Sequence, residues 1–373
     1  MLYCSAVALD LLVRYPGRSV RSRIQVRRGA LDRLGACARA IKARRVAVVS
    51  DATVAALYGG LSVRSLERAG LTASLVTVPP GERAKNPRQL VRLWGWLGAL
   101  GLTRGDAVVA LGGGVVGDLA GFAAATWLRG VAWIGVPTSL VAQIDSCVGG
   151  KTAVDLEVGK NLVGAFHQPV AVLVDPDALA TLPERHHRAG LAELVKLGMA
   201  VDGGLFAWTE RHARRLRGRD GAVLEQAVAR AIRVKARVVR GDERERWGGA
   251  RTALNYGHTL GHALESACGY RGPLHGEAVA IGMRAAAAIS TRVAGLSAAA
   301  RARQDALLDA FGLPRRVPPV ALEDLLRAMR QDKKRGAAEV RWVLTPRVGH
   351  ASVPRPVDRR LVRSALIEIG ARV

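Results

Sequence analysis

Short aliphatic runs alternate with amphipathic stretches through the first half of the chain. The runs hold four to six residues and are almost wholly apolar, as expected for strands buried on both faces. The stretches between them, such as 52–58 and 88–100, have apolar residues at helical spacing. Strands that alternate with helices predict an α/β fold, in which a parallel sheet has helices on both faces. The predicted strands lie at 46–50, 75–78, 107–111, 131–136 and 170–174.

From about residue 183 onward the strand signal nearly disappears. Long stretches rich in Ala, Leu, Arg and Glu, such as 222–239 and 279–293, predict helices instead. A short apolar run at 340–344 is a candidate late strand. We therefore expect two domains, an α/β domain at 1–180 and a mainly α-helical domain at 181–373.

The composition argues against several classes of protein. Of the 373 residues 49% are hydrophobic and the mean hydropathy is +0.12, so a large core is expected and disorder is not. No uncharged apolar stretch reaches the roughly 18 residues that a membrane helix needs. The four cysteines are far apart and form no CxxC pair, which argues against a disulfide scaffold or a thiolate zinc site. A cytoplasmic protein is therefore expected.

The net charge of +25 comes from 56 Lys and Arg against 31 Asp and Glu. Arg supplies 48 of these cations and Lys only eight. Nucleic-acid-binding proteins usually gather their basic residues in a patch or stripe, whereas Arg here is scattered along predicted helix faces. We therefore predict no nucleic-acid partner and no membrane partner.

A glycine-rich segment, GGGVVGD at 112–118, follows the predicted strand 107–111. Glycines let backbone N–H groups approach a phosphate, and the N-terminus of a following helix attracts its negative charge. Glycine turns after strands are also common without any ligand, and a run of three glycines is not the usual form of the GxGxxG fingerprint, although 112, 114 and 117 have its spacing. The segment is thus a candidate nucleotide site whose geometry differs from the usual dinucleotide fold.

Three lysines occupy motif-like segments in a chain that otherwise uses Arg. Lys151 and Lys160 lie on glycine-rich backbone that we expect to form loops, Asn161 follows Lys160, and Lys196 lies on a predicted helix. Solvated surface lysines are the ordinary alternative. A compact or pKa-tunable charge is a reason to keep Lys where Arg would not serve. We therefore expect phosphate or carboxylate contacts at these positions.

A carboxylate and three histidines form a metal-like set. Glu193 lies three residues before Lys196, His258 and His262 are four apart on one helix face, and His275 follows. A carboxylate with two imidazoles is a common site for a catalytic divalent ion. A lone histidine is usually structural, and spacing leaves open which two of the three would bind the ion.

The other histidines carry less information. His186, His187 and His212 adjoin arginines and are expected on a solvated surface, and His167 is expected to be structural.

Taken together, these motifs resemble the 3-dehydroquinate synthases of the sugar-phosphate cyclase superfamily. The resemblance runs from about residue 46 to about residue 348. GGGVVGD, DSCVGGKTAVD, GKNLVGAFHQP, AGLAELVK and LNYGHTLGHALE occur in the family's order, and five such segments in order are highly specific. The resemblance implies a Rossmann-like NAD-binding domain, an α-helical metal-binding domain and a homodimer.

The resemblance also implies the site residues. Zinc or cobalt would be held by Glu193, His258 and His275, which leaves His262 to the substrate. The NAD-binding positions would be Asp51, Glu82, Lys85, Gly113, Gly114, Val115, Gly117, Asp118, Thr138, Ser139, Lys151, Lys160, Thr181 and Leu182. The catalytic and substrate-binding positions would be Arg129, Asp145, Lys151, Asn161, Lys196, Lys235, Glu245, Arg251, Asn255, His262, Lys333 and Lys334.

The implied reaction converts the sugar acid 3-deoxy-D-arabino-heptulosonate 7-phosphate into 3-dehydroquinate and phosphate, in the shikimate pathway to aromatic amino acids. The family does this by NAD-mediated transient oxidation, phosphate elimination, re-reduction and intramolecular aldol closure. Alternatives are a sister sugar-phosphate cyclase, such as an aminodehydroquinate synthase, and a metal-dependent polyol dehydrogenase. Two departures stand out: Cys147 replaces a usual Ser, and the segment 245–251 is about two residues longer than usual, which leaves the register of Lys235 and Glu245 open.

Overall fold

A computed structural model of the chain describes residues 8–15, 21–246, 248–331 and 339–372. It contains two compact units that divide between Leu182 and Pro183, where the sequence analysis drew a boundary at 180. Lys333 and Lys334 lie outside the described residues. Among the described helices, none combines the length and the apolar character needed to cross a bilayer.

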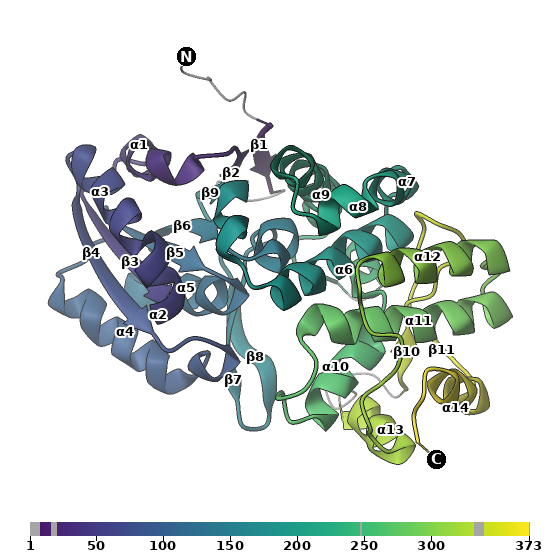
Figure 1. The fold of residues 1–373 in the computed structure, drawn as a ribbon. Coiled ribbons are helices and arrows are strands. Elements are labelled where there is room, and N and C mark those ends of the chain that lie inside the picture. Colours follow the sequence, from purple (N-terminus) through teal and green to yellow (C-terminus); the bar gives the residue numbers. More distant parts are fainter. Residues whose placement is uncertain (1–7, 16–20, 247, 332–338, 373) are drawn as a thin grey trace. The chain divides into compact units, whose positions relative to one another are not determined.

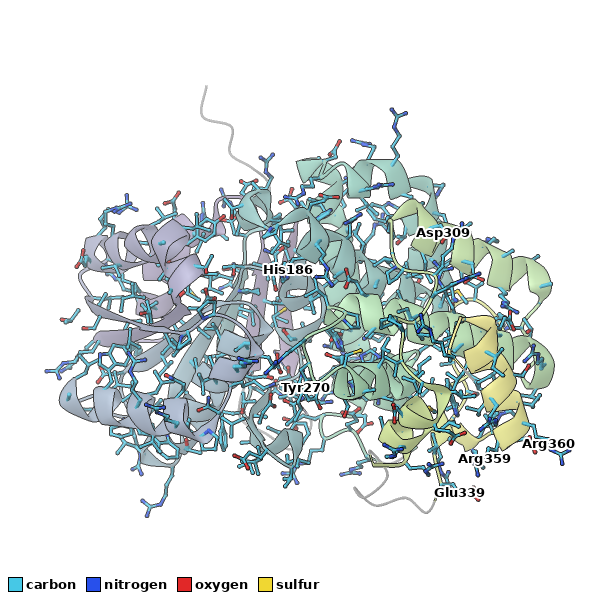
Figure 2. All side chains as sticks on the ribbon, turned by 60° about the horizontal axis from the view of Figure 1, so that its bottom comes forward. His186, Tyr270, Asp309, Glu339, Arg359 and Arg360 are labelled. Atoms are coloured by element: carbon cyan, nitrogen blue, oxygen red, sulfur yellow. The ribbon has the colours of Figure 1, made fainter. Side chains whose placement is uncertain are left out.

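Arginine side chains are spread over the surfaces of both units (Figure 2). Many pair with a nearby carboxylate, as Arg23 does with Asp10 and Arg185 with Glu277. Others extend into solvent, as Arg359 and Arg360 do at the start of the last helix (Figure 2). The large positive charge is therefore distributed, and most of it belongs to ordinary surface side chains.

The first unit is built on a mainly parallel sheet (Figure 1). The strand order is β1-β2-β9-β6-β5-β3-β4, and within the described residues only β1 runs antiparallel to its neighbour. All five predicted strands are present. The β1–β2 pair was not predicted, and its alternating polar residues suit a sheet edge. The strands are β1 (Leu9–Arg14), β2 (Arg21–Val26), β3 (Arg45–Asp51), β4 (Thr72–Val78), β5 (Ala107–Gly112), β6 (Ala132–Pro137) and β9 (Ala171–Val174).

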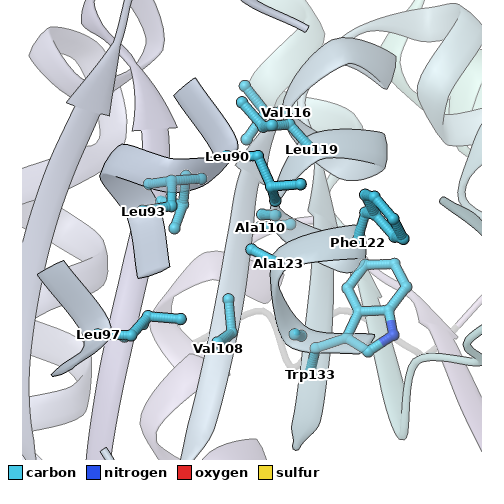
Figure 3. Packing of buried hydrophobic residues seen from close by; sticks show 14 of the residues in the cluster. Leu90, Leu93, Leu97, Val108, Ala110, Val116, Leu119, Phe122, Ala123 and Trp133 are labelled. Carbon is cyan, nitrogen blue, oxygen red and sulfur yellow. The ribbon is translucent and has the colours of Figure 1, made fainter. Parts of the chain in front are cut away.

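Both faces of this sheet are covered, as the apolar runs predict. On β3, Val46 and Val48 pack on one face while Ala47 and Val49 pack on the other. Helices α4 and α5 cover the second face, where Leu93 is fully buried (Figure 3). Burial of one such leucine contributes about 1.5–3 kcal/mol to folding. The helices of this unit are α1 (Leu34–Ala40), α2 (Ala52–Val54), α3 (Gly60–Arg68), α4 (Pro87–Ala99) and α5 (Gly114–Thr126).

Several short helical turns connect these elements. Two are π-helical, at Ala55–Gly59 and Ala142–Ser146. The 3₁₀ turns of the chain are Ala30–Arg33, Glu82–Ala84, Trp127–Arg129, Pro176–Thr181 and Ala250–Asn255.

The segment expected to form glycine-rich loops is instead a β-hairpin. Strand β7 (Lys151–Leu156) pairs antiparallel with β8 (Gly159–Phe166), so the loop prediction for Lys151, Lys160 and Asn161 was wrong. Thr152, Ala153 and Val154 are buried and hold the hairpin against α5. The glycines and lysines weaken the strand signal in the sequence, and the hairpin is stabilised by tertiary packing instead.

The second unit is mainly α-helical, as predicted (Figure 1). Helix α11 lies at its centre and is buried on almost every side from Gly276 to Ser290. The predicted strand at 340–344 is reduced to β10 (Arg341–Trp342), which pairs with β11 (Arg355–Pro356). The helices are α6 (Glu184–Ala200), α7 (Gly203–Arg211), α8 (Ala213–Arg217), α9 (Gly221–Gly241), α10 (His258–Ala267), α11 (His275–Val293), α12 (Ala298–Ala310), α13 (Leu322–Gln331) and α14 (Arg359–Glu368).

One histidine prediction was wrong in this unit. His187 is fully buried on α6, and its Nε2 lies 2.9 Å from the carbonyl oxygen of Leu216. His186, one position earlier, is exposed as predicted. The helical turn rotates adjacent side chains by about 100°, so one of two neighbouring histidines faces the core.

Candidate active site

The glycine-rich segment forms the turn from β5 into α5. Strand β5 ends at Gly112, Gly113 is the N-cap, and Gly114, Val115 and Gly117 lie in the first turn of α5. The first N–H groups of a helix have no partner within the helix, so this end is suited to a phosphate. A pocket opens here, at the carboxyl ends of β5 and β6, which is where α/β sheets bind ligands. It is lined by Gly112, Gly113, Gly114, Gly117, Asp118, Pro137, Ser146, Cys147, Gly150 and Lys151, among others.

A buried lysine gathers several of the predicted cofactor residues beside this pocket. The side chain of Lys85 is 4% exposed, and its Nζ lies 3.0 Å from Asp118 Oδ2 and 3.3 Å from Glu82 Oε1. Nζ also donates to Asn161 Oδ1 at 2.6 Å. Lys160 Nζ lies 3.4 Å from the same Glu82 oxygen. The structure thus brings together residues that are up to 79 positions apart in the chain.

One member of this cluster, Asp155, had no role predicted from the sequence. Asp155 Oδ1 lies 3.6 Å from Lys85 Nζ and accepts a hydrogen bond from the backbone N–H of Asn161 at 2.9 Å. That bond holds Asn161 at φ 57°, a conformation that few residues other than glycine adopt. Asp155 is the last residue of the DSCVGGKTAVD segment, and its place in that motif was the available signal.

Burial and the charges of neighbouring side chains shift the pKa values of this cluster in opposite directions. Burial raises the pKa of Asp118 to about 6, and the adjacent Lys85 only partly offsets this effect. For Glu82 burial acts the same way, but the charges of Lys85 and Lys160 outweigh it and lower the pKa. Burial lowers the pKa of Lys85, and the three carboxylates more than compensate and raise it. Lys85 is therefore a charged centre that favours the ionised form of each neighbouring acid, although burial still raises the pKa of Asp118.

The other predicted cofactor residues of the same unit lie at the ends of strands or, for Thr181 and Leu182, at the end of the 3₁₀ turn Pro176–Thr181. Asp51 ends β3, and its Oδ1 accepts from the N–H groups of Thr53 and Val54, both at 3.0 Å. Thr138 is buried just after β6, and Ser139 follows it. Thr181 Oγ1 lies 2.7 Å from the hydroxyl of Tyr58, and Leu182 follows. Arg129 and Asp145 also belong to this unit; Arg129 is exposed and has φ 65°.

The metal-like residues converge within the second unit. Single ligand atoms of Glu193, His258 and His275 all lie within 4.8 Å of one another. These residues come from the middle of α6 and from the first positions of α10 and α11. Both carboxylate oxygens of Glu193 are buried; among the described residues neither accepts a hydrogen bond of normal geometry, and Oε2 is in ion-pair contact with Lys196. A carboxylate with two imidazoles around such oxygens fits a divalent ion.

The two histidines have their Nδ1 atoms engaged elsewhere. His258 Nδ1 lies 3.3 Å from the backbone oxygen of Tyr256, and His275 Nδ1 lies 3.2 Å from Glu265 Oε2. His275 Nε2 faces Glu193 Oε1 at 3.7 Å. An imidazole whose Nδ1–H is donated to an acceptor presents its Nε2 lone pair to a metal. Glu265 had no predicted role, although it ends the LNYGHTLGHALE segment.

Two of the predicted substrate residues of this unit, Lys196 and His262, lie beside the metal-like residues. Lys196 is almost fully buried and its Nζ contacts Glu193 Oε2. His262 is exposed, and its ring centroid lies 5.2 Å from that of His258 and 6.1 Å from that of His275. The structure therefore places a cation and a third imidazole beside the metal-like residues.

The register around the longer segment 245–251 is also visible. Glu245 Oε1 accepts a hydrogen bond from Asn255 Nδ2 at 2.9 Å, so these two predicted residues are in contact. Arg251 is buried, and its guanidinium donates to the backbone oxygen of Glu243 at 2.6 Å. Lys235 is buried on α9. In the first unit, Cys147 Sγ donates to the backbone oxygen of Gln143 at 3.3 Å.

Comparison with protein families matches most of the chain. Residues 75–189 match the family model described as 3-dehydroquinate synthase N-terminal, and residues 190–335 match the C-terminal model of the same name. Curated 3-dehydroquinate synthases include that of Citrifermentans bemidjiense, 46% identical over 93% of this chain and 94% of the relative. That of Gloeobacter violaceus is 47% identical over 90% of this chain and 93% of the relative.

Solved structures with a similar fold include other cyclases. A 2-deoxy-scyllo-inosose synthase, complexed with carbaglucose-6-phosphate, NAD+ and Co2+, has a TM-score of 0.87, 27% identity and coverage of 96% and 99%. A 2-epi-5-epi-valiolone synthase from Streptomyces hygroscopicus, with NAD+ and Zn2+ bound, has a TM-score of 0.85, 29% identity and coverage of 95% and 98%. A glycerol dehydrogenase from Schizosaccharomyces pombe shares the fold, with a TM-score of 0.66 and 16% identity over 92% of this chain and 87% of that one.

Proposed function

The chain belongs to the 3-dehydroquinate synthase family, and from this premise we propose which of its residues perform the family's reaction. The reaction converts 3-deoxy-D-arabino-heptulosonate 7-phosphate into 3-dehydroquinate and phosphate in the shikimate pathway, and the enzyme is a phosphorus–oxygen lyase. Its cofactors are NAD and a divalent metal ion. The observation that carries the residue assignment is the convergence of Glu193, His258 and His275.

The proposed metal ligands are these three residues. Their support is the buried carboxylate of Glu193, whose Oε1 accepts no hydrogen bond among the described residues, together with two imidazoles whose Nδ1 atoms are already engaged. A bound divalent ion supplies Lewis-acid polarisation of the hydroxyl that is oxidised. Lys196, in contact with Glu193, places a second positive charge where the alkoxide character develops.

The proposed NAD site is the pocket at the start of α5 with its adjoining charge cluster. The N–H groups that follow Gly113 are suited to the diphosphate, and Asp51 at the end of β3 is suited to a ribose hydroxyl. Bound NAD supplies a hydride acceptor that returns the hydride later in the same turnover. Glu82, Lys85, Asp118 and Lys160 hold the wall of this site through their mutual ion pairs. Thr138, Ser139, Lys151, Thr181 and Leu182 complete the proposed set.

The remaining predicted residues are proposed as substrate contacts. Lys151 and Asn161 in the first unit, and Asn255 and His262 in the second, offer phosphate-binding groups, and the exposed Arg129 is a further phosphate ligand. The planar fork of Arg251 is suited to the carboxylate. Asp145, Lys235 and Glu245 orient hydroxyls and move protons, for which the Glu245–Asn255 hydrogen bond sets one orientation. Lys333 and Lys334, outside the described residues, keep their proposed contact with substrate.

Sister cyclases are the second candidate, since they share the fold. The identity is 45–47% to curated 3-dehydroquinate synthases and 27–29% to the two solved sister cyclases, which favours the former. An aminodehydroquinate synthase also needs a carboxylate site. Arg251 therefore distinguishes it from a 3-dehydroquinate synthase less well than it distinguishes the cyclases whose sugar phosphates carry no carboxylate. A polyol dehydrogenase shares only the fold.

We further propose a homodimer that works in the cytoplasm on a small phosphorylated sugar acid, without a nucleic-acid or membrane partner. The three described cysteines are free thiols, which suits a reducing compartment.

One turnover assay tests the proposed activity. Enzyme, NAD+ and Co2+ or Zn2+ are incubated with the heptulosonate phosphate, and released phosphate and dehydroquinate are measured with the absorbance of NADH. We expect equal amounts of both products and no accumulation of NADH. Turnover of glucose 6-phosphate or sedoheptulose 7-phosphate in preference would instead identify a sister cyclase.

The ligand set is tested by metal content. We expect His275→Ala to lose bound metal, and His262→Ala to keep the metal while losing activity. Retention of a full equivalent of metal by His275→Ala would refute the ligand assignment.

A further inference from the structure

A second carboxylate beside the metal-like residues, that of Glu265, contacts the ring of His275. Glu265 lies on α10 seven residues after His258, so both point from the same side of that helix. Its Oε2 lies 3.2 Å from Nδ1 of His275, which is the first residue of α11. The side chain of Glu265 is only 11% exposed. A nearly buried carboxylate is costly without hydrogen-bond donors, and the Nδ1–H of an adjacent imidazole supplies a charge-assisted hydrogen bond to it.

The two ring nitrogens of His275 therefore have different neighbours. Nε2 faces Glu193 at 3.7 Å, and Nδ1 faces Glu265. When Nδ1–H is donated to the carboxylate, the neutral ring keeps its lone pair on Nε2, on the side of Glu193 and His258. The negative charge behind the ring also increases the electron density that Nε2 can offer to a cation.

The second imidazole provides an internal comparison. His258 Nδ1 faces a backbone carbonyl at 3.3 Å, which is a neutral acceptor, whereas His275 faces a carboxylate. His258 is buried, so the surrounding helices already restrict its ring. His275 is about one-third exposed and begins its helix, so packing restrains its ring less. The stronger hydrogen-bond acceptor, the carboxylate of Glu265, therefore contacts the histidine whose ring is less restrained by packing.

We propose that Glu265 is a positioning residue for the metal: it fixes the tautomer and orientation of His275 and strengthens the bond from Nε2 to the ion. This inference rests on the proposed metal ligands Glu193, His258 and His275. Ligand atoms of His262, Glu265 and His275 also lie within 4.8 Å of one another, so the test must separate positioning from direct ligation by Glu265.

The test measures the Zn2+ dissociation constant by competition with a chromophoric chelator in wild type, Glu265→Gln and Glu265→Ala. Loss of such a partner weakens metal binding about 10- to 100-fold. We expect Glu265→Gln, which keeps an acceptor without the charge, near the lower value, and Glu265→Ala near the upper one. Each variant is also loaded with Co2+, whose visible spectrum should shift because the ligand field of His275 changes.

Glu277→Gln is the matched control. Glu277 lies two residues after His275, pairs with Arg185 at 2.7 Å and accepts from the N–H of Leu274 at 2.8 Å. The same loss of charge two residues after His275 should leave the Zn2+ affinity within about twofold and the Co2+ spectrum unchanged. Thermal unfolding of each variant in chelator separates folding defects from metal binding.

The outcomes distinguish the possibilities. Wild-type Zn2+ affinity and an unchanged Co2+ spectrum in both Glu265 variants would overturn the inference. Loss of metal by Glu265→Gln as complete as that of His275→Ala would overturn it in favour of direct ligation. Failure of the wild type to bind a stoichiometric ion would refute the proposed metal site itself, which is a different result.

Discussion

Lys85 shows how one buried charge organises its surroundings. An isolated ammonium would pay a large desolvation cost in this position, and three carboxylates and the Asn161 side chain offset it. Lys85 and Lys160 face Glu82, Asp118 and Asp155, so the cluster has more acids than bases. Burial raises the pKa of Asp118 to about 6; Lys85 lowers it, and the charges of Glu82 and Asp155 add smaller upward effects.

We expect Lys85→Met to lower the free energy of unfolding by about 3–5 kcal/mol at pH 8, because it leaves buried carboxylates without their cation. The loss should be smaller at pH 5. Without Lys85 the folded-state pKa of Asp118 rises further above its unfolded value, so protonation relieves the folded state at low pH and the penalty grows as pH rises through that pKa. Urea unfolding at both pH values measures the difference.

The control for this variant is Lys42→Met, at an exposed lysine outside the cluster, which should change stability little at either pH. An equal loss at pH 5 and pH 8 in Lys85→Met would contradict the electrostatic explanation.

His187 gives a second prediction at the same scale. Burial lowers its pKa, the hydrogen bond to Leu216 opposes this, and the charges of Arg219 and Glu184 add smaller effects of opposite sign. The unfolded state therefore takes up a proton first, and the free energy of unfolding falls as pH drops from about 6.5 toward the lowered pKa, by at most about 1.4 kcal/mol per pH unit. His187→Gln should flatten that part of the stability curve. Identical pH slopes for variant and wild type would argue against it.

At the scale of helices, close backbone contacts bring the metal-like residues together. A Cβ at Gly276 would overlap the carbonyl oxygen of Ala189, so α11 meets α6 without an intervening side chain. A Cβ at Gly282 would likewise overlap the carbonyl oxygen of Gly257, next to the first residue of α10. These contacts position His275 beside Glu193 and His258.

We expect Gly276→Ala to lower the free energy of unfolding by about 1–3 kcal/mol, because the added methyl forces the two helices apart. It should also weaken Zn2+ binding, since His275 moves with the helix. The matched control is Gly95→Ala on α4, where a Cβ meets nothing within 4 Å and should stabilise the helix by about 0.4–1 kcal/mol. Denaturant unfolding and metal competition test both, and unaltered Zn2+ affinity in Gly276→Ala would show that this contact does not place the ligand.

The elements themselves were predictable where local pattern and burial agree. The strands around 46–50 and 107–111 were found because they are apolar on both faces, and both sheet faces are covered. The β7–β8 hairpin was missed because its stability comes from packing on α5, not from its own glycine-rich sequence. The strand predicted at 340–344 has only two residues in the structure, as does the strand with which it pairs.

For the whole molecule, the candidate NAD residues belong to one unit and the candidate metal ligands to the other. The proposed NAD site and the proposed metal site therefore use separate sets of side chains. The positive charge is likewise shared by both units and is largely paired or solvated.

We expect a chelator to abolish turnover while leaving NAD+ affinity within about threefold of its starting value, since the cofactor site keeps all its own residues. Isothermal titration of NAD+ into chelator-treated and reloaded enzyme measures this, and re-addition of Co2+ or Zn2+ should restore activity. Parallel loss of NAD+ binding would show that the two sites are not independent.

The sequence alone determined the α/β and helical halves, the family and the identity of most candidate residues, because strand and helix periodicity and short motifs are local properties of the chain. Tertiary structure decided which histidines face Glu193, which carboxylates surround Lys85, and that Glu245 meets Asn255. It also buried His187 and placed Glu265 behind His275. Such contacts join distant segments, and they depend on how closely whole helices and strands pack, which spacing along one element does not specify.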